Sequence, residues 1–310
     1  MPELPEVETI RRQLAPHVEG RTLTAVEVLD ARWGAPRPPA EVAAGLAGRS
    51  VLGLARAGKY LIWELSDDRH LLMHLRMTGT LLFDPPADPP HTRVRVALSD
   101  GHRLVYLDPR RFGTGHLLES SQARDAYLAC RLGPEPLTPQ FTTAYLRRAA
   151  RGRSAPVKSF VLDQRRIAGV GNIYADEALF RAGIHPLRAT GSLRPAQLEA
   201  LRIGIEDALA AGIEAKGATI DDFRHLDGAY GSFQDQFLVH RREGRPCTRC
   251  GMPVRKLVVG GRGTYVCERC QPRPRARSRP RRPTGASAGG APPARSRAGQ
   301  AVGAATTGGA

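Results

Sequence analysis

The sequence contains no long apolar run and no leader of the type that directs secretion. No stretch approaches the about 18 consecutive apolar residues that a membrane-spanning helix requires. The first residues, MPELPEVETI, carry acids where a secretory signal has basic and then apolar residues. We therefore expect a soluble, intracellular protein that has no membrane partner.

Cysteine is also scarce, because the chain has only five in 310 residues, and this excludes a disulfide scaffold. Four of them form two CxxC pairs, namely Cys247, Cys250, Cys267 and Cys270. A strand-like RKLVV, a GGRG turn and a TYVC run lie around and between the pairs, which is typical of a zinc β-ribbon. Four thiolates complete a tetrahedral shell, so the sequence predicts one structural Zn²⁺. Redox pairs or free thiols are the alternatives.

Acidic residues are outnumbered, since 46 Lys and Arg stand against 30 Asp and Glu, a formal net charge of +16. Residues 272–310 contain eight Arg and no acid, which leaves +8 (38 − 30) for residues 1–271. A basic body favours a polyanionic partner, and nucleic acid is preferred to membrane because no amphipathic basic helix stands out. The tail has almost no apolar bulk and is expected to be disordered. It either adds salt-sensitive nucleic-acid affinity or is simply solvated.

The pattern of apolar residues predicts an α+β multidomain fold. After a short helix that begins near Leu4 and closes at Pro16 and Gly20, residues 22–118 carry short β-rich runs between turns, which is typical of a sandwich. Residues 145–150, 156–168, 173–182 and 195–213 lack strand alternation and are expected to be helical. We predict a β-sandwich domain with flanking helices at 1–133, a helical domain at 134–236, a zinc β-ribbon at 237–271 and a tail at 272–310.

The GVGN turn, residues 169–172, joins two of the expected helices. Gly169 is placed to end the first helix and Asn172 to cap the second. Helix pairs joined in this way offer free amides to phosphate groups.

The N-terminus carries the most unusual candidate group. Met before a small residue is normally trimmed, which would expose the secondary amine of Pro2. An α-amino group with a pKa of about 7.7–8.0 is roughly one-tenth free base at pH 7, far more than a lysine with a pKa near 10.4. Amine attack on a sugar carbon gives a Schiff base, and Glu3 and Glu6 are close enough in sequence to move the protons. The alternative is an ordinary helix start, where acids suit the helix dipole.

Six motifs in order extend over residues 1 to about 271: MPELPEVE, AGKYL, LRMTG, DPRRFG, GVGNIYADE and the terminal ribbon. Together they resemble formamidopyrimidine-DNA glycosylase. The resemblance implies a helix–two-turn–helix DNA-binding domain and a monomer that acts on damaged double-stranded DNA in the bacterial cytoplasm. It also implies base excision repair of oxidised purines, such as 8-oxoguanine and formamidopyrimidines opposite cytosine. The family removes a flipped base and nicks the strand by β,δ-elimination.

The same resemblance assigns catalytic roles to individual residues. Pro2 is the nucleophile, and Glu3 is the acid and base that opens the sugar. Lys59 is a proton donor or phosphate partner during strand cleavage. Glu6 supports this cluster, and Arg262 at the ribbon tip is linked to the second elimination.

Further residues match the family's DNA contacts. Met77, Arg110 and Phe112 match the wedge, the partner of the orphaned cytosine and the stacking aromatic that fill the void left by a flipped base. For Met77 and Phe112 the alternative is core packing. The phosphate contacts are matched by His91, Arg153, Lys158, Asn172 and Arg262.

The sequence departs from the family pattern at three places. A Tyr usually stands where this chain has His240, which leaves one phosphate contact open. Ile220 replaces a Thr that is common in the damaged-base loop, which leaves the lesion preference open. The tail 272–310 has no counterpart. A catalytically silent DNA-binding protein would need only Lys158, Asn172, Arg262 and zinc. Intact Pro2, Glu3 and Lys59 count against it.

Overall fold

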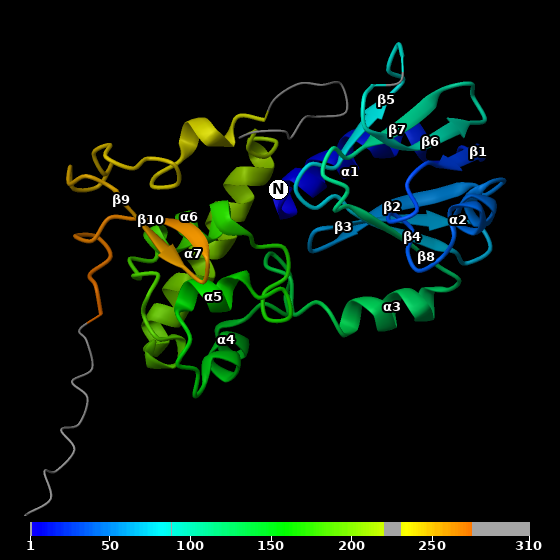
Figure 1. Ribbon diagram of the computed structural model, residues 1–310. Coiled ribbons are helices and arrows are strands. Elements are labelled where there is room, and N and C mark those ends of the chain that lie inside the picture. Colours follow the sequence, from blue (N-terminus) through cyan, green and yellow to red (C-terminus); the bar gives the residue numbers. More distant parts are fainter. Residues whose placement is uncertain (1, 88, 220–230, 275–310) are drawn as a thin grey trace, which may run out of the picture. The chain divides into compact units, whose positions relative to one another are not determined.

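The computed structural model describes residues 2–87, 89–219 and 231–274 (Figure 1). Met1, Ile220 and the expected tail from residue 275 onward lie outside these ranges. The elements of the first half of the chain are α1 (Leu4–Val18), β1 (Leu23–Val28), α2 (Pro39–Leu46), β2 (Val51–Ala57), β3 (Tyr60–Leu65), β4 (His70–His74), β5 (Thr80–Phe83), β6 (Thr92–Leu98), β7 (Arg103–Leu107), β8 (Thr114–Leu118) and α3 (Ser121–Ala129). Those of the second half are α4 (Thr143–Ala150), α5 (Val157–Leu162), α6 (Asn172–Arg181), α7 (Pro195–Glu214), β9 (Arg255–Val259) and β10 (Arg262–Val266), with short 3₁₀ turns at Thr190–Ser192 and Phe233–Gln236.

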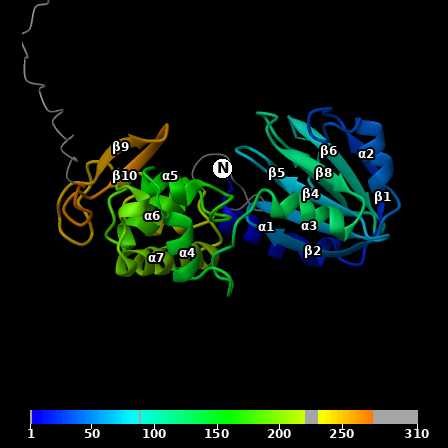
Figure 2. The same cartoon turned by 90° about the horizontal axis from the view of Figure 1, so that it is seen from below.

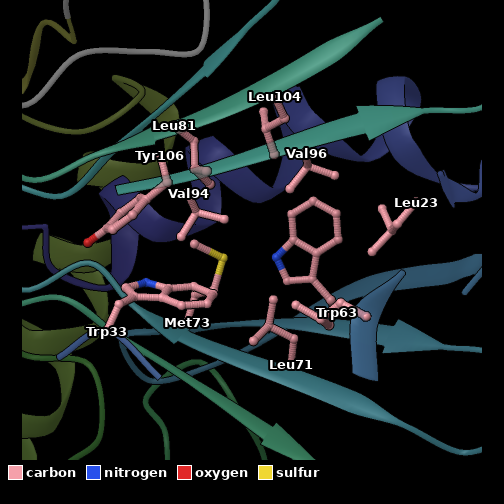
Figure 3. A pocket seen from close by; sticks show the side chains of 11 residues that line it. Leu23, Trp33, Trp63, Leu71, Met73, Leu81, Val94, Val96, Leu104 and Tyr106 are labelled. Atoms are coloured by element: carbon pink, nitrogen blue, oxygen red, sulfur yellow. The ribbon is translucent and has the colours of Figure 1, made fainter. Parts of the chain in front are cut away.

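The predicted β-sandwich is confirmed. Two four-stranded sheets, ordered β1-β6-β7-β5 and β2-β3-β4-β8, pair antiparallel throughout. Their facing sides enclose an apolar core that contains Trp33, Trp63, Met73 and Tyr106 (Figure 3). The core retains a cavity of only about 20 Å³ with an apolar lining. A cavity of this kind stays dry and offers no polar groups for chemistry, so the functional site lies elsewhere.

Four elements of this domain were missed by the sequence pattern. Strands β5 and β8 are short and depend on pairing with β7 and β4. Helix α2 interrupts the region that was expected to contain strands only. Helix α3 buries none of its residues and starts at a Ser120 cap, whose hydroxyl accepts from the Ala123 N–H. Short or exposed elements of this kind give little hydrophobic periodicity in the sequence, because they do not bury a continuous apolar face.

The helices α4, α5, α6 and α7 gather into one group (Figure 2). Three of the four helical predictions are confirmed, but residues 156–168 form a helix only to Leu162. Residues 173–180 of α6 are all buried, which makes α6 the central helix of this group. Leu4 of α1 also belongs to its apolar cluster. The first turn of α1 is therefore packed into the helical core, although α1 begins the sandwich domain.

The C-terminal strands β9 and β10 form a two-stranded antiparallel ribbon. Gly260 and Gly261 make its turn with positive φ angles of 56° and 75°, a conformation that glycine adopts without steric cost. The predicted β-ribbon is thereby confirmed, with Arg262 directly after the turn. Among the described residues, no helix has the length and apolar character needed to cross a membrane.

Candidate active site

Glu3 lies with its carboxylate at the N-terminus of α6. Its Oε2 accepts the Gly171 N–H at 2.7 Å and its Oε1 accepts the Ile173 N–H at 3.0 Å. The residue is only 2% exposed. A helix N-terminus has unpaired N–H groups and a partial positive charge, so it stabilises a carboxylate. Glu3 thus performs the capping role that the sequence assigned to Asn172, and Gly171 is the cap residue of the backbone.

Glu6 supports Glu3 from one turn further along α1. One oxygen, Oε2, accepts the Glu3 N–H at 2.8 Å, while Oε1 accepts the Tyr174 hydroxyl at 2.7 Å and the Ala218 N–H at 2.8 Å. Burial raises the pKa of Glu6, and the neighbouring charge of Glu3 raises it further against these hydrogen bonds. The carboxyl therefore joins α1, α6 and the segment after α7 in one buried network.

Pro2 is buried at the start of this network. The residues that follow it are fixed by backbone and side-chain bonds, because the Leu4 N–H also donates to the Gly169 carbonyl at 3.1 Å. A chain that starts at Pro2 would therefore carry its amine on the residue directly before the fixed Glu3.

Lys59 occupies the two-residue turn between β2 and β3 and is 5% exposed. Burial lowers the pKa of its ammonium, the charges of Glu3 and Glu6 oppose this, and those of Arg262 and Arg76 add to it. The side chain is thus within electrostatic reach of both carboxylates and of the ribbon tip. A lowered pKa increases the neutral fraction of the amine, which suits proton transfer.

His74 also lies near Lys59, whose charge acts on it. Its ring lies edge-on to Tyr60, with 4.9 Å between centroids, and its Nδ1 accepts the Arg76 N–H at 3.1 Å. Burial, and then the charges of Arg76 and Lys59, lower its pKa to about 3. His74 is therefore neutral at physiological pH. The sequence could not indicate this position, because the register that pairs residues 60 and 74 exists only in the sheet.

Two of the expected phosphate contacts hold the ribbon in this structure. Lys158 is fully buried, and its ammonium donates to Asp176 at 2.7 Å, to the Thr264 hydroxyl at 2.8 Å and to the Gly263 carbonyl at 3.1 Å. The Asn172 amide donates to the same carbonyl at 3.0 Å. The ammonium of Lys158 thus has three partners and faces no solvent. Both side chains fix the strand that follows the exposed Arg262.

His240 lies beneath the ribbon as part of the same support. Its Nδ1 is 2.8 Å from Asp176 Oδ2, and the residue is 5% exposed. Its backbone N–H donates to Glu177 at 3.0 Å. His240 is therefore packed against α6.

Met77, Arg110 and Phe112 are exposed. Met77 is 42% and Phe112 49% exposed, which excludes the core alternative for both. The Arg110 guanidinium lies over the Phe112 ring, 4.9 Å from its centroid. The DPRRFG loop folds around buried Asp108, whose Oδ2 accepts the Gly113 N–H at 2.7 Å.

The two remaining predicted contacts are His91, whose backbone carbonyl accepts the Asp108 N–H at 3.1 Å, and Arg153. His91 is exposed before β6, with a φ of 68°. Arg153 is half-buried after α4, where its Nε donates to the Ala149 carbonyl. Within the described ranges neither side chain is hydrogen-bonded to the network around Glu3.

The four ribbon cysteines converge on one point. All their sulfurs lie within 4.8 Å of one another, with 3.8 Å from Cys247 to Cys270 and 3.4 Å from Cys250 to Cys267. Zinc–sulfur bonds of about 2.3 Å in a tetrahedron place sulfurs roughly 3.8 Å apart, whereas a disulfide needs about 2.05 Å. The donor set therefore fits one structural Zn²⁺.

Comparison with known families now adds to this geometry. Residues 1–115 match the formamidopyrimidine-DNA glycosylase N-terminal domain, residues 132–224 match the H2TH domain of the same glycosylase, and residues 244–273 match a zinc finger found in FPG and IleRS. The chain belongs to the formamidopyrimidine-DNA glycosylase family. Membership makes it a DNA repair glycosylase with a zinc finger domain.

Individual members of the formamidopyrimidine-DNA glycosylase family are similar over most of the chain. The protein of that name from Chloroflexus aggregans is 44% identical over 273 residues, 87% of this chain and 98% of the relative. A Lactococcus lactis Fpg in complex with DNA containing an abasic site has a TM-score of 0.82 and 34% identity, over 87% and 100% of the two chains. A complex of Lactococcus lactis Fpg with DNA containing Fapy-dG has a TM-score of 0.81, with 33% identity over the same shares.

Proposed function

We propose that this chain is a bifunctional DNA glycosylase and abasic-site lyase that uses the amine of Pro2 as its nucleophile. The observation that carries the proposal is the placement of Glu3, which is buried, held by amides of α6 and directly follows Pro2. Lys59, in the β2–β3 turn, lies within electrostatic reach of the same carboxylate. An amine, a fixed carboxylate and a lysine of lowered pKa are the groups that Schiff-base chemistry requires.

In the proposed reaction the unprotonated Pro2 nitrogen attacks C1′ of the damaged nucleotide. The bond from C1′ to the base breaks, and the base leaves with a proton. Glu3 protonates O4′ as the sugar ring opens, which leaves an iminium between Pro2 and C1′. Loss of a C2′ proton breaks the bond from C3′ to the phosphate, and a second elimination breaks the bond at C5′. Lys59 and Arg262 assist these proton transfers and bind the phosphate groups. Water finally hydrolyses the bond between C1′ and Pro2, which releases the enzyme.

The proposed substrate is double-stranded DNA that contains an oxidised purine such as 8-oxoguanine or a formamidopyrimidine. The Lactococcus lactis complexes with Fapy-dG and abasic-site DNA support this assignment. The exposed Met77, Arg110 and Phe112 are proposed to fill the space of the flipped base. His91, Arg153, Lys158, Asn172 and Arg262 are proposed as the phosphate-binding set, of which Lys158 would need to leave its buried partners. We further propose a cytoplasmic monomer with domain boundaries after residues 133, 236 and 271.

The test is borohydride reduction on duplex that contains the lesion. We expect the trimmed protein to be trapped covalently on DNA, and a version with an N-terminal extension, in which Pro2 remains in a peptide bond, to bind the duplex without being trapped. Trapping and nicking by the extended protein would contradict the mechanism. Tight lesion binding by the trimmed protein without trapping or nicking would instead favour a silent DNA-binding protein.

A further inference from the structure

The turn that carries Lys59 is held from outside its own hairpin. Gly58, the residue before Lys59, has a φ of +56° and donates its N–H to Glu135 Oε2 at 2.6 Å. Its carbonyl accepts from Arg56 Nη1 at 3.2 Å. Both polar backbone groups of Gly58 thus have side-chain partners. One partner, Glu135, is 77 residues away in the sequence.

Glu135 and Arg56 form a paired, two-point contact. Arg56 Nη1 donates to Oε2 at 2.8 Å and Nη2 to Oε1 at 2.7 Å, and the two side chains are 19% and 13% exposed. Bidentate bonds between Arg and a carboxylate fix orientation as well as distance. The carboxylate that binds the Gly58 N–H therefore has a defined position.

The pair extends to α1 through Glu8. Arg56 Nε donates to Glu8 Oε2 at 3.0 Å. Although burial raises the pKa of Glu8, hydrogen bonds from Arg11, Arg12 and Arg56 lower it to about 2. Glu8 is thus an anion at physiological pH. The same chain of charges links the helix that begins beside Pro2 to the turn that carries Lys59.

Glu135 is itself attached to the helical domain. Its neighbours are bonded to the segment between α5 and α6: the Gly133 N–H donates to the Gln164 carbonyl at 2.9 Å, and the Ala168 N–H donates to the Pro134 carbonyl at 3.2 Å. This segment continues into Gly169 and the turn that holds Glu3. The backbone of Glu135 therefore belongs to the body that positions the carboxylate.

Apolar packing alone does not explain the position of the turn. A cleft of about 230 Å³ opens beside it, lined by Gly58, Leu132, Glu135 and Ala168 among others. Gly58 nevertheless lies close to the helical domain, because a Cβ built on it would be 3.3 Å from Gly169 N and 3.4 Å from Ala168 Cβ. This close approach and the polar bonds to Glu135 and Arg56 together determine where the backbone of Lys59 begins.

We propose that Glu135 is a positioning residue for Lys59, whose backbone it holds in place beside the Glu3 network through Arg56 and the Gly58 N–H. The inference rests on the proposed function for the role of Lys59, but the position of Lys59 can be measured without catalysis. Glu135 touches no reacting atom. Glu135 links the position of the helical domain to the position of Lys59.

The experiment compares the full-length wild type with Glu135→Ala and Glu135→Gln. Reductive methylation of amines, followed by mass spectrometry of the peptide that contains Lys59, reports how accessible the buried lysine has become. Single-turnover nicking of a duplex with a preformed abasic site, at saturating enzyme, reports the chemical step. Glu199→Ala is the matched control, because it removes another Glu–Arg pair, with Arg202 in α7, that lies outside the site.

We expect Glu135→Ala to label faster at Lys59 and to nick about tenfold more slowly, since misplaced acid–base groups lose much of their effect. Glu135→Gln keeps an acceptor for Gly58 and should lie between Ala and wild type, while Glu199→Ala should match wild type. Unchanged labelling in Glu135→Ala overturns the proposal, whatever the nicking rate. If thermal unfolding shows that Glu135→Ala is not folded, Glu135→Gln decides by the same criterion. A wild type that never nicks DNA refutes the proposed function, whereas the labelling result still tests the position of Lys59.

Discussion

Gly171 is the position where the smallest substitution has the largest expected effect. A Cβ built on Gly171 would lie 2.2 Å from Glu3 Cδ, and 2.5 and 2.6 Å from its two oxygens. Its φ of −124° is open to any residue, so Gly171→Ala adds a steric conflict without backbone strain. Because Cβ contacts are essentially never under 3.0 Å, the carboxylate must move by about 0.8 Å (3.0 − 2.2) or more.

That displacement has a calculable consequence for the proposed chemistry. A misplacement of about 1 Å costs on the order of 100-fold in rate, which corresponds to about 2.7 kcal/mol of transition-state stabilisation. The charge-assisted bonds from Gly171 and Ile173 to Glu3 would also weaken, which should lower the free energy of unfolding by about 1–3 kcal/mol. We therefore expect Gly171→Ala to bind lesion duplex and zinc but to excise the base about 100-fold more slowly.

The assay is single-turnover base release at saturating enzyme, with urea unfolding in parallel. Gly53→Ala is the matched control, because the added Cβ would meet the end of the flexible Glu64 side chain at 3.1 Å and that of Glu19 at 4.0 Å. A Gly171→Ala protein with the excision rate of the wild type would refute the assignment of Glu3 to the reaction.

Three further predictions concern the rest of the fold. Glu8 has a folded pKa of about 2, below its unfolded value, so its contribution to stability is present above the unfolded pKa and is lost as pH falls towards 2. Glu8→Gln should lower the free energy of unfolding at pH 7 by about 1–2 kcal/mol after allowance for solvent screening, and by less at pH 3; an equal loss at both pH values in urea titrations would be inconsistent with this. Cys247→Ser should lose zinc by metal analysis and bind DNA more weakly, because ribbon folding depends on the metal; full affinity without zinc would exclude that dependence. Phe112→Ala should change the free energy of unfolding by less than about 0.5 kcal/mol, since the ring is exposed, yet slow lesion excision; a large fall in melting temperature would show that the ring has a packing role instead.

The elements that could be predicted are those with a strong local signal. The bounds of α7 agree with the expected 195–213 to within a few residues, and strands of the sandwich lie within residues 22–118, where β-rich runs were expected. The helix predicted for residues 156–168 ends at Leu162 in the structure. The prediction was too long because nothing in the local pattern marks the turn that begins after Leu162. Helix α1 also continues past Pro16 to Val18. Short elements such as β5 depend on a partner that is distant in sequence, and a local pattern cannot contain this information.

What the sequence determined by itself was local in the chain. The four zinc ligands lie within one short segment, and two cysteines separated by two residues can reach one metal from a single turn. Pro2 and Glu3 are adjacent, so their pairing required no fold. The tertiary structure alone decided that Glu3 caps a helix 168 residues away and that Glu135 binds the turn before Lys59. These contacts arise because burial of separate apolar faces brings distant segments together, and only then do their polar groups find partners.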